Sequence, residues 1–226
     1  DDPTGDSTFD LDGKEATIKV SSGETVTVTF TNRKGPEQPV KRDFGDAPDP
    51  TYPTLLGSNG ARHIIGTIWM GNTVDAETDG QPTISADGDD LNPVGTPDDE
   101  DGVTFLGAGP PGGPYDMPYI FGQNGAVRIK VSGDVSEQKP AYLHGWIDWN
   151  YDGDWNDAGE NIFSGTKVTA PGDYTINFPV PANAKPGKSY ARFRIDDQNL
   201  NSATGEVTNG EVEDYLIDPA VRAPPE

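Results

Sequence analysis

Apolar and polar residues alternate in short runs along this chain, and proline or glycine interrupts nearly every window long enough for a helix. One face of a β-strand repeats every two residues, whereas a helix repeats about every 3.6 residues, so the pattern argues against any long helix. The runs that alternate in this way lie at 16–20, 25–30, 125–131, 141–148, 173–178, 189–195 and 212–217. Their spacing predicts an all-β fold, an antiparallel β-sandwich of immunoglobulin-like or jelly-roll-like type.

Composition divides the chain into five predicted segments. Residues 1–34 hold two strand runs, which we expect to be either the end of a preceding domain or strands donated to another sheet. Residues 35–41 are a proline-containing linker that cannot be helical. Residues 42–114 form an acidic, loop-rich leader that packs on the sandwich of residues 115–218, and residues 219–226 are a terminal linker.

Oxygen-bearing side chains recur at every second residue after position 147. Calcium takes about six to eight oxygen ligands, and loops of the EF-hand type supply them from alternate positions, with glycine at the sixth. The side chains at positions one, three, five and nine of such a loop are those of Asp148, Asn150, Asp152 and Asn156. Gly153 falls at the sixth position, and Asp154 offers its backbone carbonyl at the seventh.

The end of this segment departs from an EF-hand. The glutamate expected at position twelve is displaced by one residue to Glu160, and the flanks read as strands rather than helices. We therefore predict a calcium loop between β-strands, with Asp157 or Glu160 completing the shell. The alternative is a solvated turn, because Asp, Asn and Gly favour turns for local backbone reasons.

The leader carries a second group of acidic residues. We predict that its early aspartates fold onto its later ones and form a second cation site. The candidate ligands are Asp43, Asp46, Asp89, Asp90, Asp99 and Asp101. Solvated, flexible loops are the alternative, although apolar residues such as Phe44 and Trp69 within the segment favour an ordered structure.

The charge balance limits the partners. The chain has 16 Lys and Arg against 38 Asp and Glu, a net charge of −22, which excludes ordinary nucleic-acid binding and disfavours anionic membranes. No direct membrane insertion is expected. There is no cysteine and there are two histidines, so disulfides, thiolate sites and His-rich zinc sites are not expected. Bound divalent cations would relieve the repulsion among the carboxylates.

The sequence makes no positive case for catalysis. It has no Ser-His-Asp order, no His-Glu metalloprotease motif and no phosphate-cradling glycine loop. Paired carboxylates suggest a glycosidase, but 38 acidic residues make such pairs uninformative. We expect His63, beside Arg62, to be a structural residue.

The last strand run contains Gly210-Glu211-Val212-Glu213-Asp214 and follows Tyr190-Ala191-Arg192-Phe193-Arg194. Together with the acidic loop, these residues closely resemble the GEVED domain family, and the likeness extends over about residues 42–218. The resemblance implies a β-sandwich module of bacterial and archaeal surface or matrix proteins, without catalytic activity of its own. Independently of it, Glu211 and Glu213 face one side of a strand, where Arg192 and Arg194 could pair with them; a surface ion-pair ladder and a ligand role stay open.

These observations predict an extracellular, calcium-stabilised structural or adhesive module at the cell surface, with calcium as its ligand and other surface proteins as partners. One alternative is a fibre subunit that joins copies of itself through strand donation from residues 1–34. Another is a carbohydrate-binding accessory module or a glycoside-active enzyme, with glycans stacking on exposed Trp149, Tyr151 and Trp155. Exposure of these aromatic residues would favour sugar binding, and burial would favour a purely structural role.

Overall fold

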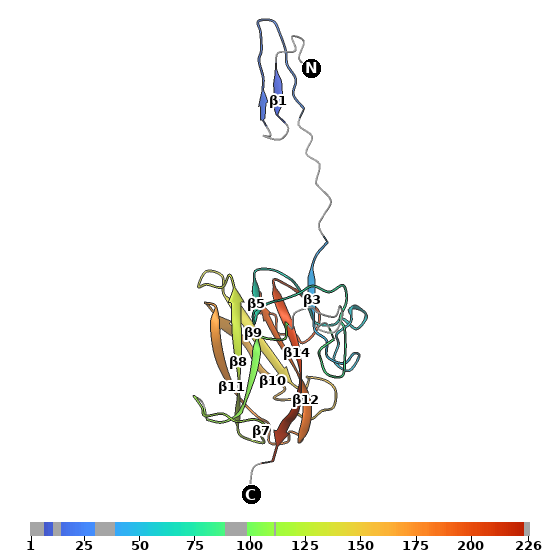
Figure 1. Ribbon diagram of the computed structural model, residues 1–226, viewed down its shortest axis with the longest axis vertical. Coiled ribbons are helices and arrows are strands. Elements are labelled where there is room, and N and C mark those ends of the chain that lie inside the picture. The colour runs from blue at the N-terminus through green and yellow to red at the C-terminus, as the bar shows by residue number, and fades with distance from the viewer. Residues whose placement is uncertain (1–6, 11–14, 30–38, 89–98, 111, 224–226) are drawn as a thin grey trace. The chain divides into compact units, whose positions relative to one another are not determined.

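The computed structural model describes residues 7–10, 15–29, 39–88, 99–110 and 112–223. The chain separates into two compact units, residues 1–39 and 40–226. The all-β prediction is confirmed: apart from one 3-10 turn at Leu56–Ser58, the regular elements of the described residues are strands (Figure 1). The described residues contain no helix with the length and hydropathy needed to cross a membrane.

The described residues of the N-terminal unit contain one strand pair, in which β1 (Thr8–Asp10) runs antiparallel to β2 (Glu15–Thr17). The strand predicted at 25–30 is wrong over its described part, because residues 25–29 belong to no strand. The strand predicted at 16–20 ends at Thr17. Alternating apolar and polar residues allow a segment to join a sheet, but a strand forms only where a second strand hydrogen-bonds to it. Strand donation from this unit stays a prediction.

Two sheets form the sandwich of the second unit. The five-stranded sheet has, in spatial order, β10 (Asn161–Val168), β9 (Ala141–Ile147), β12 (Gly187–Asp196), β14 (Gly210–Arg222) and β7 (Tyr119–Ile120). In the opposing sheet, β8 (Asn124–Gly133) is the central strand. It pairs with β11 (Gly172–Pro179), β5 (Ile68–Met70) and β6 (Val103–Ala108). All pairs are antiparallel except β14 with β7. The predicted antiparallel sandwich is therefore confirmed, although β5 and β6 come from the leader and β14 runs beyond residue 218.

The core lies between the two sheets. Leu143, Phe193 and Ile195 from one sheet and Val127 and Ile129 from the other are fully buried. These residues occupy alternate positions of their strands, so burial follows the period of two that the sequence shows. The opposite face of the five-stranded sheet is also buried at β12 and β14, where Arg192, Arg194 and Asp214 are at most 1% exposed and the leader covers them.

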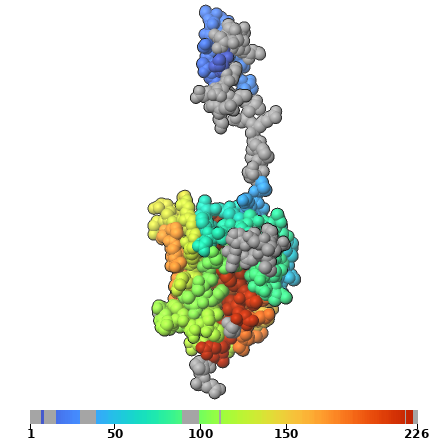
Figure 2. All heavy atoms as spheres, in the orientation of Figure 1, coloured from blue at the N-terminus to red at the C-terminus, as the bar shows by residue number. Residues whose placement is uncertain are grey.

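A small third sheet joins two strands of the leader, β3 (Arg42–Phe44) and β4 (Arg62–Ile64), to β13 (Glu206–Thr208). In Figure 2 the leader, in cyan and teal, borders the red C-terminal strand. Tyr52 from the leader packs against Trp155 and Tyr190, with ring centroids 4.6 and 4.9 Å away. This second apolar cluster joins the leader to the outer face of the sheet.

Two buried arginines of β12 also hold the leader. The Nε and Nη2 atoms of Arg192 donate to the two carboxylate oxygens of Asp214, each at 2.6 Å, and Nη1 donates to the Pro53 carbonyl at 2.7 Å. Arg194 donates from Nε to His63 Nε2 at 2.9 Å. The expected pairing of both arginines with Glu211 and Glu213 is wrong, because the arginines lie on the face of Asp214, opposite to those glutamates.

Candidate metal centre

The loop between β9 and β10 brings three carboxylates together. Asp148 directly follows β9, Glu160 directly precedes β10, and Asp152 lies between them. One ligand atom from each of these residues lies within 4.8 Å of the other two. Among the described residues, no other set of three acidic, His or Cys side chains meets this criterion. The predicted residues Asp148, Asp152 and Glu160 are thus placed together, while the bound ion stays a prediction.

The loop folds around the carboxylate of Asp148, which is fully buried. Its Oδ2 atom accepts hydrogen bonds from the Tyr52 hydroxyl at 2.6 Å and from the Gly153 N–H at 3.0 Å. Gly153 has a φ of +98°, and a Cβ atom there would lie 2.5 Å from a methyl group of Thr51. Glycine is therefore required both by the backbone and by the close approach of the leader.

Glu160 is the buried glutamate of the three, with 1% of its surface exposed. Oε2 accepts the Asp157 N–H at 3.0 Å, whereas Oε1 is buried without a hydrogen-bond partner. Burial, together with the charges of Asp148, Asp152 and Asp157, raises the pKa of Glu160 to about 7. An unpaired buried carboxylate is costly, and a cation at this point would satisfy Oε1 and offset the repulsion.

The other predicted loop ligands are arranged differently. Asn150 has a buried Oδ1 without a partner, and its amide nitrogen donates to Asp157. Asp154 and Asn156 are exposed, and the Asp154 carboxylate accepts the Asn156 N–H at 2.8 Å. Asp154 and Asp157 lie outside the set of three carboxylates. Of these residues, Asn150 has the atom best suited to join the set.

The second predicted cation site, formed by aspartates of the leader, is ordered in the part that the structure describes. Asp43, Asp46 and Asp99 are at most 3% exposed, which excludes solvated loops at these positions. Their carboxylates accept backbone N–H groups of Val212 at 2.7 Å, Gly88 at 2.5 Å and Asp75 at 2.9 Å, respectively.

Asp101 accepts the Asn72 N–H at 2.7 Å. Asp89 and Asp90 lie outside the described residues. The four described members do not form a set of three ligand atoms within 4.8 Å. The sequence placed Glu211 and Glu213 of β14 on one face of a strand but did not predict that both are buried, because the motif alone does not show which face of the strand is covered.

The family model of the GEVED domain matches residues 142–218. The chain contains a GEVED domain. The match spans β9 to β14 and includes the acidic loop and the arginine pair. Comparison with curated proteins and with solved structures finds no significant match.

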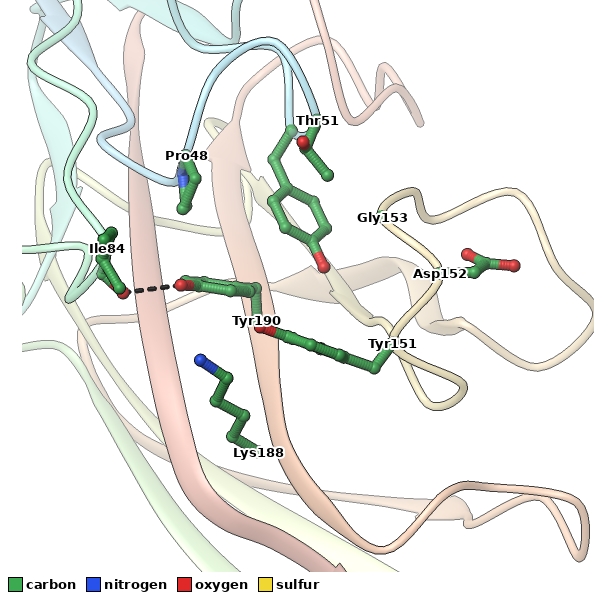
Figure 3. Close-up of a pocket in the computed structure, with 9 residues that line it drawn as sticks. Pro48, Thr51, Ile84, Tyr151, Asp152, Gly153, Lys188 and Tyr190 are labelled. Carbon is green, nitrogen blue, oxygen red and sulfur yellow. Dashed lines mark hydrogen bonds between the residues drawn. The ribbon is translucent and has the colours of Figure 1, made fainter.

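A cavity of about 400 Å³ opens beside the acidic loop of the GEVED domain (Figure 3). It is lined by Pro48, Thr51, Tyr52, Ile84, Tyr151, Asp152, Gly153, Lys188 and Tyr190. The rings of Tyr151 and Tyr190 are nearly parallel, at 12°, with centroids 6.2 Å apart, and Lys188 Nζ lies 5.4 Å from the Tyr151 ring. Figure 3 shows Pro48 and Thr51 on the side of the rings opposite to Lys188.

The aromatic residues of the loop have different exposures. Tyr151 is 43% exposed, whereas Trp149 and Trp155 are 2% and 7% exposed. The expectation that both tryptophans are exposed is wrong. Trp149 packs edge-on against Tyr119 in the core, and Trp155 packs under Arg192 at 4.7 Å. A sugar platform built from all three aromatics is therefore excluded, and Tyr151 alone remains available.

One buried histidine of the GEVED domain lies between a serine and an aspartate. His144 Nε2 is 3.3 Å from Asp196 Oδ2, and Ser164 Oγ is 3.4 Å from Nδ1. The Gly165 N–H also donates to Nδ1, at 3.2 Å, and His144 is fully buried. A ring nitrogen that already accepts a backbone N–H is poorly placed to take a proton from serine. The arrangement therefore does not support a serine nucleophile, and His144 Nε2 has no hydrogen-bond partner.

Proposed function

We propose that this protein is an extracellular structural or adhesive module whose GEVED domain is stabilised by calcium bound in the loop between β9 and β10. The observation that carries the proposal is the convergence of Asp148, Asp152 and Glu160 within 4.8 Å, with Glu160 Oε1 buried and lacking a donor. The available donors are oxygens, which suit a hard cation.

Calcium fits better than magnesium, because calcium tolerates irregular geometry, whereas magnesium demands a near-ideal octahedron. The expected role is structural. A cation held by Asp148 would fix the loop against Tyr52, which contacts the same carboxylate at 2.6 Å, and so would strengthen the contact between loop and leader. Because the chain has no cysteine, a bound cation would link these segments where a disulfide could not. Extracellular modules use weak calcium sites with a Kd of about 10⁻⁴–10⁻³ M, and we expect the loop to bind calcium in this range.

The test is thermal unfolding with calcium chloride or excess chelator, combined with elemental analysis of bound metal. At a calcium concentration of about 100 times Kd, binding to the native state adds about 2.7 kcal/mol, or about 5–11 °C in Tm for a domain of this size. Asp152→Asn removes an exposed ligand and should abolish most of this shift. Asp173→Asn, an exposed carboxylate on β11, is the matched control. Absence of bound calcium together with an unchanged Tm in chelator would contradict the proposal.

A second candidate function is glycan binding at the cavity beside the loop. The supporting observation is the exposed Tyr151 ring, with Lys188 and Asp152 around it. A flat aromatic face surrounded by hydrogen-bond donors and acceptors matches a sugar, which has an apolar face and a rim of hydroxyls. The loop that holds Asp152 would make this binding depend on calcium.

A further inference from the structure

Two glutamates of β14 are buried between the sheets. Glu211 pairs across the ladder with Ile195, and Glu213 pairs with Phe193. Residues that face each other in antiparallel strands point to the same side of the sheet, and both partners belong to the apolar core. The glutamates are each 1% exposed. Two carboxyl groups thus enter the edge of the core, on the face away from Arg192.

The two glutamates differ in their hydrogen bonds, and only Glu211 has a carboxylate oxygen without a partner. The carboxylate of Glu213 accepts the Gly102 N–H at 3.0 Å and the Tyr215 hydroxyl at 2.7 Å. Glu211 accepts the Met70 N–H through Oε2, but its Oε1 atom is buried and has no hydrogen-bond partner. No Lys or Arg of the described residues lies within ion-pair distance of either glutamate.

Further carboxylates surround Glu211. Asp43 accepts the N–H of Val212, the residue between the two glutamates, at 2.7 Å. Burial, and then the charges of Glu213, Asp43 and Asp99, raise the pKa of Glu211 well above its ordinary value. Asp43 also acts electrostatically on Arg194, but the N–H groups of Arg194 are directed at carbonyl oxygens and at His63. A proton or a cation at the unpartnered Oε1 atom would relieve the repulsion at Glu211.

We propose that a second calcium ion binds to Glu211 Oε1, with Asp43 and Asp99 supplying further oxygens. Oε1 is a fully buried acceptor with no donor, and the two aspartates come from the leader, so one ion would connect three separate segments. Glu211, Asp43 and Asp99 do not offer three ligand atoms within 4.8 Å of one another, so binding requires these side chains to move closer together. The site is independent of the loop between β9 and β10 and goes beyond the function proposed above.

Glu211→Gln distinguishes a cation from a proton, because glutamine has the shape of a neutral glutamic acid. With a cation at this site, native mass spectrometry in calcium should show two ions on the intact chain and one on the variant, and the Tm in calcium should fall. With a protonated Glu211, the number of ions should stay the same and the Tm should be unchanged or higher, and either result would overturn the proposal.

Two further variants separate this site from the loop site. Asp152→Asn should remove only the loop ion, and the double variant with Glu211→Gln should bind none. If Asp152→Asn leaves the count unchanged while Glu211→Gln lowers it, the function proposed for the loop fails and the second site stands. If Glu211→Gln does not fold, Asp99→Asn, located in the leader, should lose the same single ion. A full complement of ions on a folded Asp99→Asn chain would refute the site.

Discussion

The buried ion pair between Arg192 and Asp214 allows the sharpest prediction for the GEVED motif. Both side chains are fully buried, and two hydrogen bonds of 2.6 Å join them. The same Asp214 carboxylate accepts the Ala47 N–H of the leader at 2.9 Å. Asp214→Asn leaves the guanidinium buried without a counter-charge, which costs about 3–5 kcal/mol. For a domain of about 150–250 residues, each kcal/mol corresponds to about 2–4 °C, so we expect Tm to fall by about 6–20 °C.

The measurement is thermal unfolding in excess calcium, so that loss of metal does not contribute. Asp134→Asn is the matched control, because it breaks the Lys139–Asp134 pair, whose side chains are 66% and 54% exposed. Exposed pairs contribute about 0–1 kcal/mol, so this variant should unfold close to the wild-type temperature. Replacing Arg192 and Asp214 together by Met and Leu should cost less than Asp214→Asn alone. If Asp214→Asn were no less stable than Asp134→Asn, the anchoring role of Asp214 would be refuted.

Two further predictions concern His63 and Tyr151. Burial and the charge of Arg194 hold the pKa of His63 well below its ordinary value, so below about pH 6.5 the unfolded chain takes up a proton that the folded chain does not. The free energy of unfolding should therefore fall with acidification, by up to about 1.4 kcal/mol per pH unit; His63→Gln should reduce that slope in urea titrations, and equal slopes would contradict the assignment. On an array of neutral, N-acetylated and uronic-acid oligosaccharides in calcium, Tyr151→Ala should bind at least tenfold more weakly than wild type, whereas Leu200→Ala, with similar exposure, should not. Absence of wild-type binding to every class would reject glycan recognition.

The strands that sequence reasoning located best are those with one face in the core. Residues 189–195 and 141–148 coincide closely with β12 and β9, because burial between two sheets imposes a strict period of two. The same signal failed at 25–29, which pairs with none of the strands in the described residues. It also missed β5, which has three residues and pairs with a segment more than 60 residues away. Pairing over such distances is not encoded in local alternation.

The acidic loop was predictable for a similar reason. Alternating oxygen donors and a glycine located Asp148, Asp152 and Glu160 correctly within one loop. The contribution of Tyr52 could not be predicted, because it comes from the leader, 96 residues before Asp148, and depends on how the leader packs. Nor could the inward direction of Glu211 be read from the sequence, since assigning faces of β14 requires its register with β12.

The GEVED motif acts on both faces of β14 because successive side chains of a strand point in opposite directions. Asp214 fixes Arg192 and the leader on the outer face, whereas Glu211 and Glu213 hold backbone N–H groups of Met70 and Gly102 on the inner face. Gly210 begins the strand where a Cβ atom would lie 1.9 Å from the Ile195 carbonyl oxygen. The three acidic positions of the motif thus connect distant segments to the sheet. Substitutions at these positions should first loosen the leader, and any binding at the loop or the cavity should weaken as a consequence.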